Sequence, residues 1–360
     1  MTFSVNLGER SYPITVESGA LARAGEILGL NRRPGNRRLG RTKERQVLIV
    51  TDSGVPAAYA EAVASQCARP TVVTVPEGEA SKSFSVLESL LGAMLERGFD
   101  RHDCAAAVGG GVVGDLTGFA ASLYMRGIDF YNIPTTMLSQ LDSSIGGKTA
   151  VDCRGVKNVV GTFWQPKGVL IDPEVLSTLP PRQLSAGLAE AVKMALTSDE
   201  ALFRIFEEQR AKGRDLRADR EVLTDVTVWA LTVKKAVVEA DEREGGLRKI
   251  LNFGHTLGHG IESAAGGSLY HGECVALGML PMCSPRVRAR LIPVLRGLEL
   301  PTSVFLPLSA VREAVLHDKK SAEGGVDAVF VDEPGSCRVE RTDPDELMER
   351  YRALFGGEER

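Results

Sequence analysis

The sequence predicts two domains, an α/β domain with a parallel sheet over residues 1–180 and a mainly α-helical domain over residues 181–360. In the first half, short apolar runs alternate with segments of helical period, which is typical of parallel α/β folds. The pair Pro180-Pro181 marks a change of character, and long segments of helical period follow it with little strand signal before residue 328. A chain of 360 residues also fits two domains of ordinary size.

The individual elements follow from the same patterns. The N-terminal segment 1–16 alternates like a strand. Further strands are expected at 47–50, 71–75, 105–108, 130–133 and 169–171, with helices at 83–97 and 115–123. In the second half, helices are expected at 183–194, 199–212, 220–240, 252–264, 273–282 and 309–316, and a strand at 328–331.

Composition narrows the class of protein. With 43 basic and 47 acidic residues, the chain has no electrostatic footprint for nucleic acid, and small-molecule partners are expected. Six scattered cysteines without a CxxC pair argue against a disulfide framework and against a thiolate zinc site. Because there is no N-terminal signal core and no long apolar run, we expect a cytoplasmic protein without a membrane segment.

A glycine-rich segment, Gly109-Gly110-Gly111-Val112-Val113-Gly114-Asp115, lies between an expected strand and an expected helix. It matches the GxGxxG pattern, in which glycines let the backbone approach a pyrophosphate at a helix N-terminus. The next strand ends at Pro134-Thr135-Thr136 and does not supply the acid that usually contacts the ribose. Asp52 and the segment Glu77-Gly78-Glu79-Ala80-Ser81-Lys82 follow other strands, so they are either cofactor contacts or ordinary polar loops.

Histidines are concentrated in one region, where three of the five fall within 17 residues. His255 and His259 stand one helical turn apart, and Gly266-Gly267 would break the helix and let His271 return to them. The cluster therefore suggests a site for one cation, although packed core histidines are the alternative. Imidazole suits zinc, and a catalytic zinc typically has three protein ligands, often including a carboxylate.

Glu190 is the candidate carboxylate for this site. It lies in an otherwise apolar helical segment, where a buried acid needs a partner such as a metal ion. Lys193 shares its helix face at i, i+3, so an intrahelical ion pair is the alternative explanation.

Several further cations stand in glycine-rich or apolar surroundings, which suggests an anionic ligand rather than a solvated surface. They are Arg126, Lys148, Lys157, Lys193, Lys234, Arg248, Lys319 and Lys320, with the amide of Asn158 beside them in sequence. The basic stretch 31–45, in contrast, is expected to be a solvated loop.

Taken in order, the long motifs of the chain resemble those of the 3-dehydroquinate synthases, which belong to the sugar phosphate cyclases. The motifs are GGGVVGDLTGFAASLYMRG, IPTTMLSQLDSSIGGKTAVD, GVKNVVGTFWQP, LPPRQLSAGLAEAVK, DEREGGLRKILNFGHTLGHGIE and HGECVALGM. The resemblance covers nearly the whole chain. It implies a Rossmann-like NAD-binding domain, a helical metal-binding domain, an active site in the cleft between them, and a homodimer.

The resemblance also implies an activity. The enzyme would convert 3-deoxy-D-arabino-heptulosonate 7-phosphate to 3-dehydroquinate and phosphate, by oxidation with NAD, β-elimination, re-reduction, ring opening and aldol closure. A divalent metal, usually zinc and with cobalt as a substitute, would be held by Glu190, His255 and His271. His259 would instead lie at the substrate phosphate and assist proton transfer.

Matching the motifs residue by residue implies two further groups of contacts. Those with NAD would be Glu77, Gly78, Glu79, Ala80, Ser81, Lys82, Gly110, Gly111, Val112, Val113, Gly114, Asp115, Thr135, Thr136, Lys148, Lys157, Val175, Leu176, Ser177 and Thr178. Those with substrate would be Asn158, Lys193, Asn252, His259 and Arg126 toward the phosphate, Lys234 and Arg248 toward the carboxylate, one or both of Lys319 and Lys320 closing the pocket, and Asp142 and Glu244 orienting these groups. Lys148 would reach the substrate as well as NAD. In a homodimer, Arg126 could come from the partner subunit.

Three other functions compete with this interpretation. They are a sugar phosphate cyclase that makes a different cyclitol, an NAD- and metal-dependent polyol dehydrogenase, and an inactive relative that serves as a scaffold. Arg248, Asn158 and an intact NFGHTLGH favour the dehydroquinate branch, and a dehydrogenase needs no pocket for both phosphate and carboxylate. The chain departs from the family pattern at Gly54, where some relatives offer the cofactor a side chain, and in the stretch 31–45.

Overall fold

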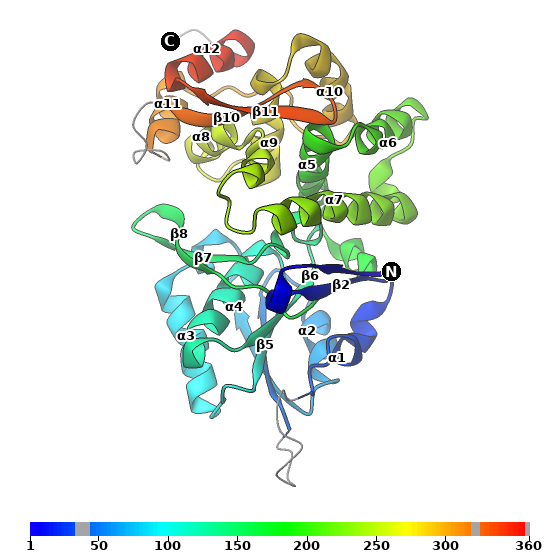
Figure 1. Cartoon of the computed structure of the whole chain (residues 1–360), viewed down its shortest axis with the longest axis vertical. Helices are drawn as coiled ribbons and strands as arrows, with labels where there is room; N and C mark the ends of the chain where they lie inside the picture. The colour runs from blue at the N-terminus through cyan, green and yellow to red at the C-terminus, as the bar shows by residue number, and fades with distance from the viewer. Residues whose placement is uncertain (33–43, 318–324, 357–360) are drawn as a thin grey trace. The chain divides into compact units, whose positions relative to one another are not determined.

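The structure is a computed structural model that describes residues 1–32, 44–317 and 325–356 (Figure 1). The chain forms two compact units, Met1–Leu179 and Pro180–Arg360. The boundary lies beside the pair Pro180-Pro181, where the sequence changes from alternating strand and helix patterns to mainly helical ones. Most of the basic stretch 31–45 lies outside the described residues, as do Lys319 and Lys320.

A seven-stranded sheet forms the first unit, in the order β1-β2-β9-β6-β5-β3-β4. The strands are β1 (Thr2–Val5), β2 (Tyr12–Val16), β3 (Gln46–Asp52), β4 (Arg69–Val75), β5 (Cys104–Gly109), β6 (Asp129–Pro134) and β9 (Val169–Ile171). Neighbours pair in parallel except β1 and β2. The N-terminal segment forms two strands rather than one, because the chain turns through a short 3-10 helix that starts at Gly8, where φ is +64°.

Both faces of this sheet are covered by helices, as Figure 1 shows. On one face pack α3 (Phe84–Glu96) and α4 (Gly111–Leu123), and on the other α1 (Ala24–Ile27) and α2 (Ala57–Ala64). The two faces divide β3 by alternation, since Leu48 and Val50 join the first core and Val47 and Ile49 the second. Continuous apolar runs therefore indicated strands correctly, because these strands are buried on both sides.

The sequence patterns missed a hairpin in this unit. It consists of β7 (Lys148–Cys153) and β8 (Val156–Phe163), which pair antiparallel in a small separate sheet. Short helical segments complete the unit, namely η4 (Tyr124–Arg126), the π-helical η5 (Ser139–Ser143) and η6 (Pro173–Thr178).

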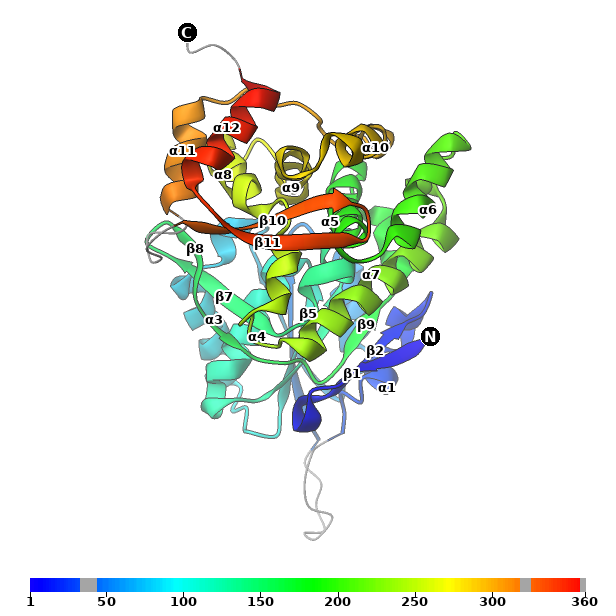
Figure 2. The same ribbon diagram turned by 45° about the horizontal axis from the view of Figure 1, so that its top comes forward.

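The second unit is mainly helical, with one antiparallel hairpin packed against α5 (Figure 2). Its helices are α5 (Pro181–Ser198), α6 (Glu200–Ala211), α7 (Arg220–Ala240), α8 (His255–Ala265), α9 (His271–Met279), α10 (Pro285–Gly297), α11 (Leu308–His317) and α12 (Pro344–Phe355), and its strands are β10 (Val326–Glu333) and β11 (Ser336–Thr342). The expected fold classes of both halves are confirmed. Helices α10 and α12 and strand β11 were not expected.

Two expected helices of this unit have different starts. The helix expected from residue 252 begins only at His255, because Gly254 adopts φ +77° and separates α8 from the 3-10 helix η8 (Leu247–Asn252). The helix expected from residue 273 begins two residues earlier, so His271 is the first residue of α9.

Glycines let α5, α8 and α9 approach with their backbones nearly in contact. A Cβ atom at Gly272 of α9 would overlap the carbonyl oxygen of Ala186 on α5. One at Gly278 would overlap the backbone of Gly254, and one at Gly258 would come within 3.1 Å of the Cys274 carbonyl oxygen. Only glycine allows this spacing without moving a helix.

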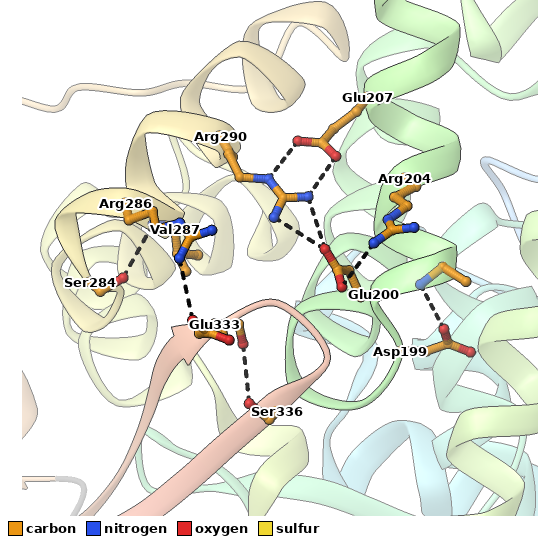
Figure 3. A network of polar contacts seen from close by, with 11 residues as sticks. Asp199, Glu200, Arg204, Glu207, Ser284, Arg286, Val287, Arg290, Glu333 and Ser336 are labelled. Atoms are coloured by element: carbon orange, nitrogen blue, oxygen red, sulfur yellow. Dashed lines mark hydrogen bonds and ion pairs between the residues drawn. The ribbon is translucent and has the colours of Figure 1, made fainter.

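An ion-pair network ties α6 to α10 (Figure 3). Arg290 Nη2 lies 2.8 Å from Glu207, and Arg290 Nη1 lies 3.3 Å from Glu200. On the same side, Arg286 Nη1 lies 3.4 Å from Glu333 at the end of β10. These side chains are partly exposed, so the network orients the helices but adds little stability per pair.

Among the described residues, no helix is both long enough and apolar enough to pass through a lipid bilayer.

The close helix packing predicts an asymmetry between two glycine-to-alanine substitutions. Gly272→Ala should destabilise the protein by roughly 1–3 kcal/mol or more, because the methyl group has no space beside Ala186. Gly92→Ala on α3 is the matched control, since no atom lies within 4 Å of its added Cβ, and it should be neutral or stabilising by about 0.5–1 kcal/mol. Urea unfolding of both variants measures the difference, and equal midpoints would contradict this account of the packing.

Candidate active site

In the first unit, the expected cofactor residues gather at one edge of the sheet. Because β3, β4, β5, β6 and β9 are parallel, the segments that follow them meet beyond the carboxyl ends, where open α/β sheets bind ligands. These segments contain Asp52, Glu77–Lys82, Gly110–Asp115, Thr135-Thr136 and Val175–Thr178. The Thr135 N–H donates to the Gly109 carbonyl oxygen at 3.0 Å, which joins two of them directly.

The glycine-rich segment is itself the start of a helix. Helix α4 begins at Gly111, four residues earlier than expected, and its N-cap Gly110 has no capping side chain. The first N–H groups of a helix lack intrahelical partners, which suits an anion. A Cβ on Gly110 would stand 3.1 Å from the Thr136 side chain, and one on Gly111 would stand 3.0 Å from Ser143 Oγ. Glycine at both positions therefore lets Thr136 and Ser143 pack closely on the start of α4.

Lys82 connects three parts of this edge. Its ammonium group is buried, lies 2.7 Å from Asp115 Oδ2 of α4 and contacts the side chain of Asn158 in the β7–β8 hairpin. Its carbonyl oxygen accepts from the Asp152 N–H at 2.8 Å. Burial alone would lower the pKa of Lys82, but Asp115 and Glu79 outweigh it and raise that pKa. Lys82 is therefore a charged link between α4 and the hairpin.

Two acids stand side by side at the carboxyl ends of β3 and β4. Asp52 Oδ1 accepts the N–H groups of Gly54 and Val55 at 2.8 and 3.1 Å, and burial raises the pKa of its carboxyl group. A Cβ at Gly54 would overlap the carboxylate of Glu77. The departure from the family pattern at position 54 thus has a local explanation, since Glu77 occupies the space.

The other expected residues of this unit differ in exposure. Lys148 and Lys157 of the hairpin and Arg126 of η4 have exposed side chains, and Met125 and Arg126 both adopt positive φ, at 51° and 66°. The side chains of Val175 and Leu176 are buried, so these two residues would contact a cofactor only through their backbone atoms. Thr178 Oγ1 lies 2.9 Å from the Tyr59 hydroxyl, Ser177 is exposed on η6, and Asp142 is half-buried in η5.

In the second unit, the close-packed helices bring three potential metal ligands together. Glu190 of α5, His255 of α8 and His271 of α9 each offer a ligand atom, and these atoms lie within 4.8 Å of one another. The Nε2 atoms of His255 and His271 lie 3.7 and 3.6 Å from Glu190 Oε1. Donors bound at zinc distances in a tetrahedral site stand about 3.4 Å apart. The separations are too long for hydrogen bonds and suit three ligands of one ion.

The carboxylate of Glu190 supports this interpretation. It is fully buried, and neither oxygen accepts a hydrogen bond of good geometry, although the ammonium group of Lys193 lies against Oε2. The ion pair expected as an alternative is therefore present together with the histidines. Burial would raise the pKa of Glu190, but Lys193 and His255 outweigh it and hold that pKa well below its usual range. A buried, charged oxygen without a donor fits a cation.

The ring orientations of the two histidines leave the inner nitrogens available. His255 Nδ1 lies 3.2 Å from the Phe253 carbonyl oxygen, and because a carbonyl only accepts, Nδ1 carries the hydrogen and Nε2 has a free lone pair. His271 Nδ1 lies 2.9 Å from Glu262 Oε2. Glu262 was not predicted as a site residue, although it lies seven residues after His255 on the same helix face.

Electrostatics distinguishes the two histidines in the absence of a cation. Burial, followed by the charge of Lys193, holds the pKa of His255 well below its usual value. Burial would also lower the pKa of His271, but the nearby carboxylate of Glu190 and the hydrogen bond to Glu262 raise it to about 9. At neutral pH a cation must therefore displace a proton from His271.

His259 is set apart from the three ligands. Its ring is exposed on α8, with its centroid 5.4 Å from that of His255 and 5.8 Å from that of His271. It does not belong to the group of ligand atoms that the described residues bring together.

Three buried cations lie on helix α5 or on the elements packed against it. Lys193 of α5, Lys234 of α7 and Arg248 of η8 are only 1%, 5% and 2% exposed, and α5 packs against both α7 and η8. The Arg248 guanidinium donates to the Glu242 carbonyl oxygen at 2.6 Å, and Asn252 Nδ2 donates to Glu244 Oε1 at 3.0 Å. Lysine and arginine are rarely buried to this extent without an anion.

Known proteins are similar to this chain over most of its length. Residues 72–186 match the family profile described as 3-dehydroquinate synthase N-terminal, and residues 187–321 match its C-terminal counterpart. The 3-dehydroquinate synthase of Pelobacter propionicus is 39% identical, over 96% of this chain and 97% of that protein. The chain belongs to the 3-dehydroquinate synthase family. The resemblance expected from the motifs is thereby confirmed.

Two further comparisons agree with this membership. The 3-dehydroquinate synthase of Symbiobacterium thermophilum is 42% identical, over 93% of this chain and 95% of that protein. Among solved structures, the 2-epi-5-epi-valiolone synthase of Streptomyces hygroscopicus, determined with NAD⁺ and Zn²⁺ bound, superposes with a TM-score of 0.84 at 28% identity. The match covers 97% of this chain and 98% of that one.

The geometry predicts different losses for the three histidines. His255→Ala and His271→Ala should lose bound metal, because each removes one of three ligands, whereas His259→Ala should retain it. Metal content after dialysis, measured by elemental analysis, checks the difference. Loss of metal from His259→Ala would contradict this division, and His102→Ala, in an exposed turn of the first unit, is the control.

Proposed function

We propose that this chain converts 3-deoxy-D-arabino-heptulosonate 7-phosphate to 3-dehydroquinate and phosphate, using NAD and one divalent cation, with zinc as the first choice. Family membership supports the reaction. The proposal rests mainly on the groups found on and around α5. The potential metal ligands Glu190, His255 and His271 lie there, and so do the buried cations Lys193, Lys234 and Arg248. Such an arrangement suits a substrate with two anionic groups and an oxidisable alcohol.

The cofactors have fitting residues in both units. When bound, NAD⁺ accepts a hydride from C5 and later returns it, and the cation acts as a Lewis acid on neighbouring oxygens. Glu190, His255 and His271 would hold the cation, and the free N–H groups at the start of α4 would hold the pyrophosphate. The NAD⁺ and Zn²⁺ bound to the valiolone synthase support both assignments.

The buried cations would bind the two ends of the substrate. Lys234 and Arg248 would take the carboxylate, since a guanidinium presents a rigid fork of donors that matches it. Lys193, Asn252 and His259 would take the phosphate. Glu244 would orient Asn252 through its hydrogen bond. Of the residues in the first unit, Lys148, Asn158 and Asp142 complete the proposed substrate set.

The proton step follows from the position of His259. Oxidation at C5 makes the C6 hydrogen acidic, and β-elimination then breaks the bond between C7 and the phosphate oxygen as the C6 proton leaves. His259, exposed on α8 and one turn from His255, would bind the departing phosphate and hold a proton for transfer. Ring opening and aldol closure would then complete the carbocycle after hydride return.

A turnover assay tests the proposal. Purified protein with NAD⁺ and zinc or cobalt should release phosphate and form dehydroquinate from the heptulosonate phosphate, and should be far less active on sedoheptulose 7-phosphate, which lacks the carboxylate. Arg248→Gln should reduce kcat/KM for the heptulosonate by about 10–100-fold, the worth of a charged hydrogen bond, whereas the exposed Arg243→Gln should not. Turnover of the sedoheptulose phosphate alone would replace the proposal with a different cyclase.

We further propose a homodimer in which Arg126 acts across the subunit interface. Arg126 lies in strained backbone beside exposed Leu123 and Met125, and β8 exposes Val156 and Phe163. Exposed apolar side chains next to Arg126 suit an interaction surface at this position.

Mixing two inactive variants tests this arrangement. If Arg126 acts in trans, mixed dimers of Arg126→Ala and Lys193→Ala contain one intact site, so random mixing should restore about a quarter of the activity. If Arg126 acts within its own subunit, the mixture stays inactive. Each variant alone is the control, and analytical ultracentrifugation verifies that dimers form and exchange.

A further inference from the structure

The two histidines of the proposed metal site are oriented by different means. The ring of His255 is fixed by a backbone group, the Phe253 carbonyl oxygen, at 3.2 Å. The ring of His271 is fixed by a side chain, the carboxylate of Glu262, at 2.9 Å. The orientation of His271 therefore depends on a residue that can be replaced without changing the backbone.

His271 also needs this anchor more than His255 does. It is the first residue of α9 and follows the turn Gly266-Gly267, in which both glycines adopt positive φ, so no preceding helical turn confines its ring. Its side chain is 31% exposed, against 13% for His255. A partly exposed imidazole at a helix start has several accessible rotamers, and only some direct Nε2 toward Glu190.

Glu262 is held where it can act on this ring. It lies on α8, seven residues after His255, and α8 packs tightly on α9 through Gly258. Its side chain is 17% exposed, so the hydrogen bond is partly shielded from water. Because a carboxylate only accepts, the contact places the hydrogen of the neutral, metal-binding imidazole on Nδ1, so that the Nε2 lone pair is the one that faces Glu190 Oε1 at 3.6 Å.

We propose that Glu262 is a positioning residue that sets the tautomer and orientation of His271 for the cation held with Glu190 and His255. This inference rests on the proposed function, in which that cation is required. Partners of this kind typically change metal affinity about 10–100-fold. Glu262 contacts the ligand and not the substrate, so its loss should weaken metal binding while leaving turnover of the fully loaded enzyme largely intact.

The test measures metal affinity directly. The full chain, stripped of metal, is titrated with Zn²⁺ in competition with a chromophoric chelator, and with Co²⁺ while its visible absorption is followed. Glu262→Leu, which keeps an apolar stem but removes the acceptor, should bind Zn²⁺ about 10–100-fold more weakly and change the Co²⁺ spectrum. Glu262→Gln keeps an acceptor without the charge and should show a smaller but measurable loss. Ser263→Ala, exposed on the same helix, is the matched control and should bind like the wild type.

Three outcomes are decisive. Weaker binding with an unchanged melting temperature of the metal-free protein, and kcat restored at high metal concentration, supports positioning rather than a structural role. Wild-type affinity and an unchanged Co²⁺ spectrum in Glu262→Leu overturn the inference, and if that variant does not fold, wild-type affinity in Glu262→Gln overturns it instead. Failure of the wild type itself to bind Zn²⁺ would refute the metal site of the proposed function.

Discussion

The second unit is organised around one buried charge, the carboxylate of Glu190. Burying a carboxylate away from solvent costs free energy unless positive charges lie beside it. The ammonium group of Lys193 on the same helix is one such charge, and the neighbouring helices α8 and α9 add the imidazoles of His255 and His271, which can hold a cation. The glycine contacts between α5, α8 and α9 make sense as the means of bringing His255 and His271 within reach of this oxygen. The close packing therefore also sets the ligand geometry. A methyl group added at one of these glycines would push a helix away, and the histidine on that helix would move with it.

The two units meet their ligands with different chemistry. In the first, the candidate site consists largely of backbone groups at the carboxyl edge of a parallel sheet, with glycines that keep side chains away and one lysine that links the segments. In the second, the site consists of buried side-chain charges. Lys193, Lys234 and Arg248 are almost fully buried, so an anionic substrate that reaches them would meet charges already removed from water.

Features that depend on a short stretch of sequence could be predicted, whereas features that depend on contacts between distant residues could not. Strands buried on both faces were visible as apolar runs, and the pairing of Glu190 with the histidines could be suggested because few residue types bind zinc. The β7–β8 hairpin was missed because its glycine-rich, polar sequence carries no alternation and depends on packing against α4. Helix α10 was missed because Pro293 and several arginines obscure its period. Glu262 was missed because its contact with His271 exists only once the Gly266-Gly267 turn has folded the chain back.

The histidine cluster illustrates why one helix can carry several functions. His255, His259 and Glu262 are spaced so that all three lie on one face of α8, and a helix fixes such spacings more rigidly than a loop does. If His255 holds the cation, Glu262 orients the next ligand and His259 receives the phosphate, then the distance between the polarised oxygens and the leaving group is set by the helix itself. This rigidity matters because oxidation and elimination act on neighbouring carbons of the substrate. A small shift of the cation relative to His259 would leave one of the two steps without its correctly placed group.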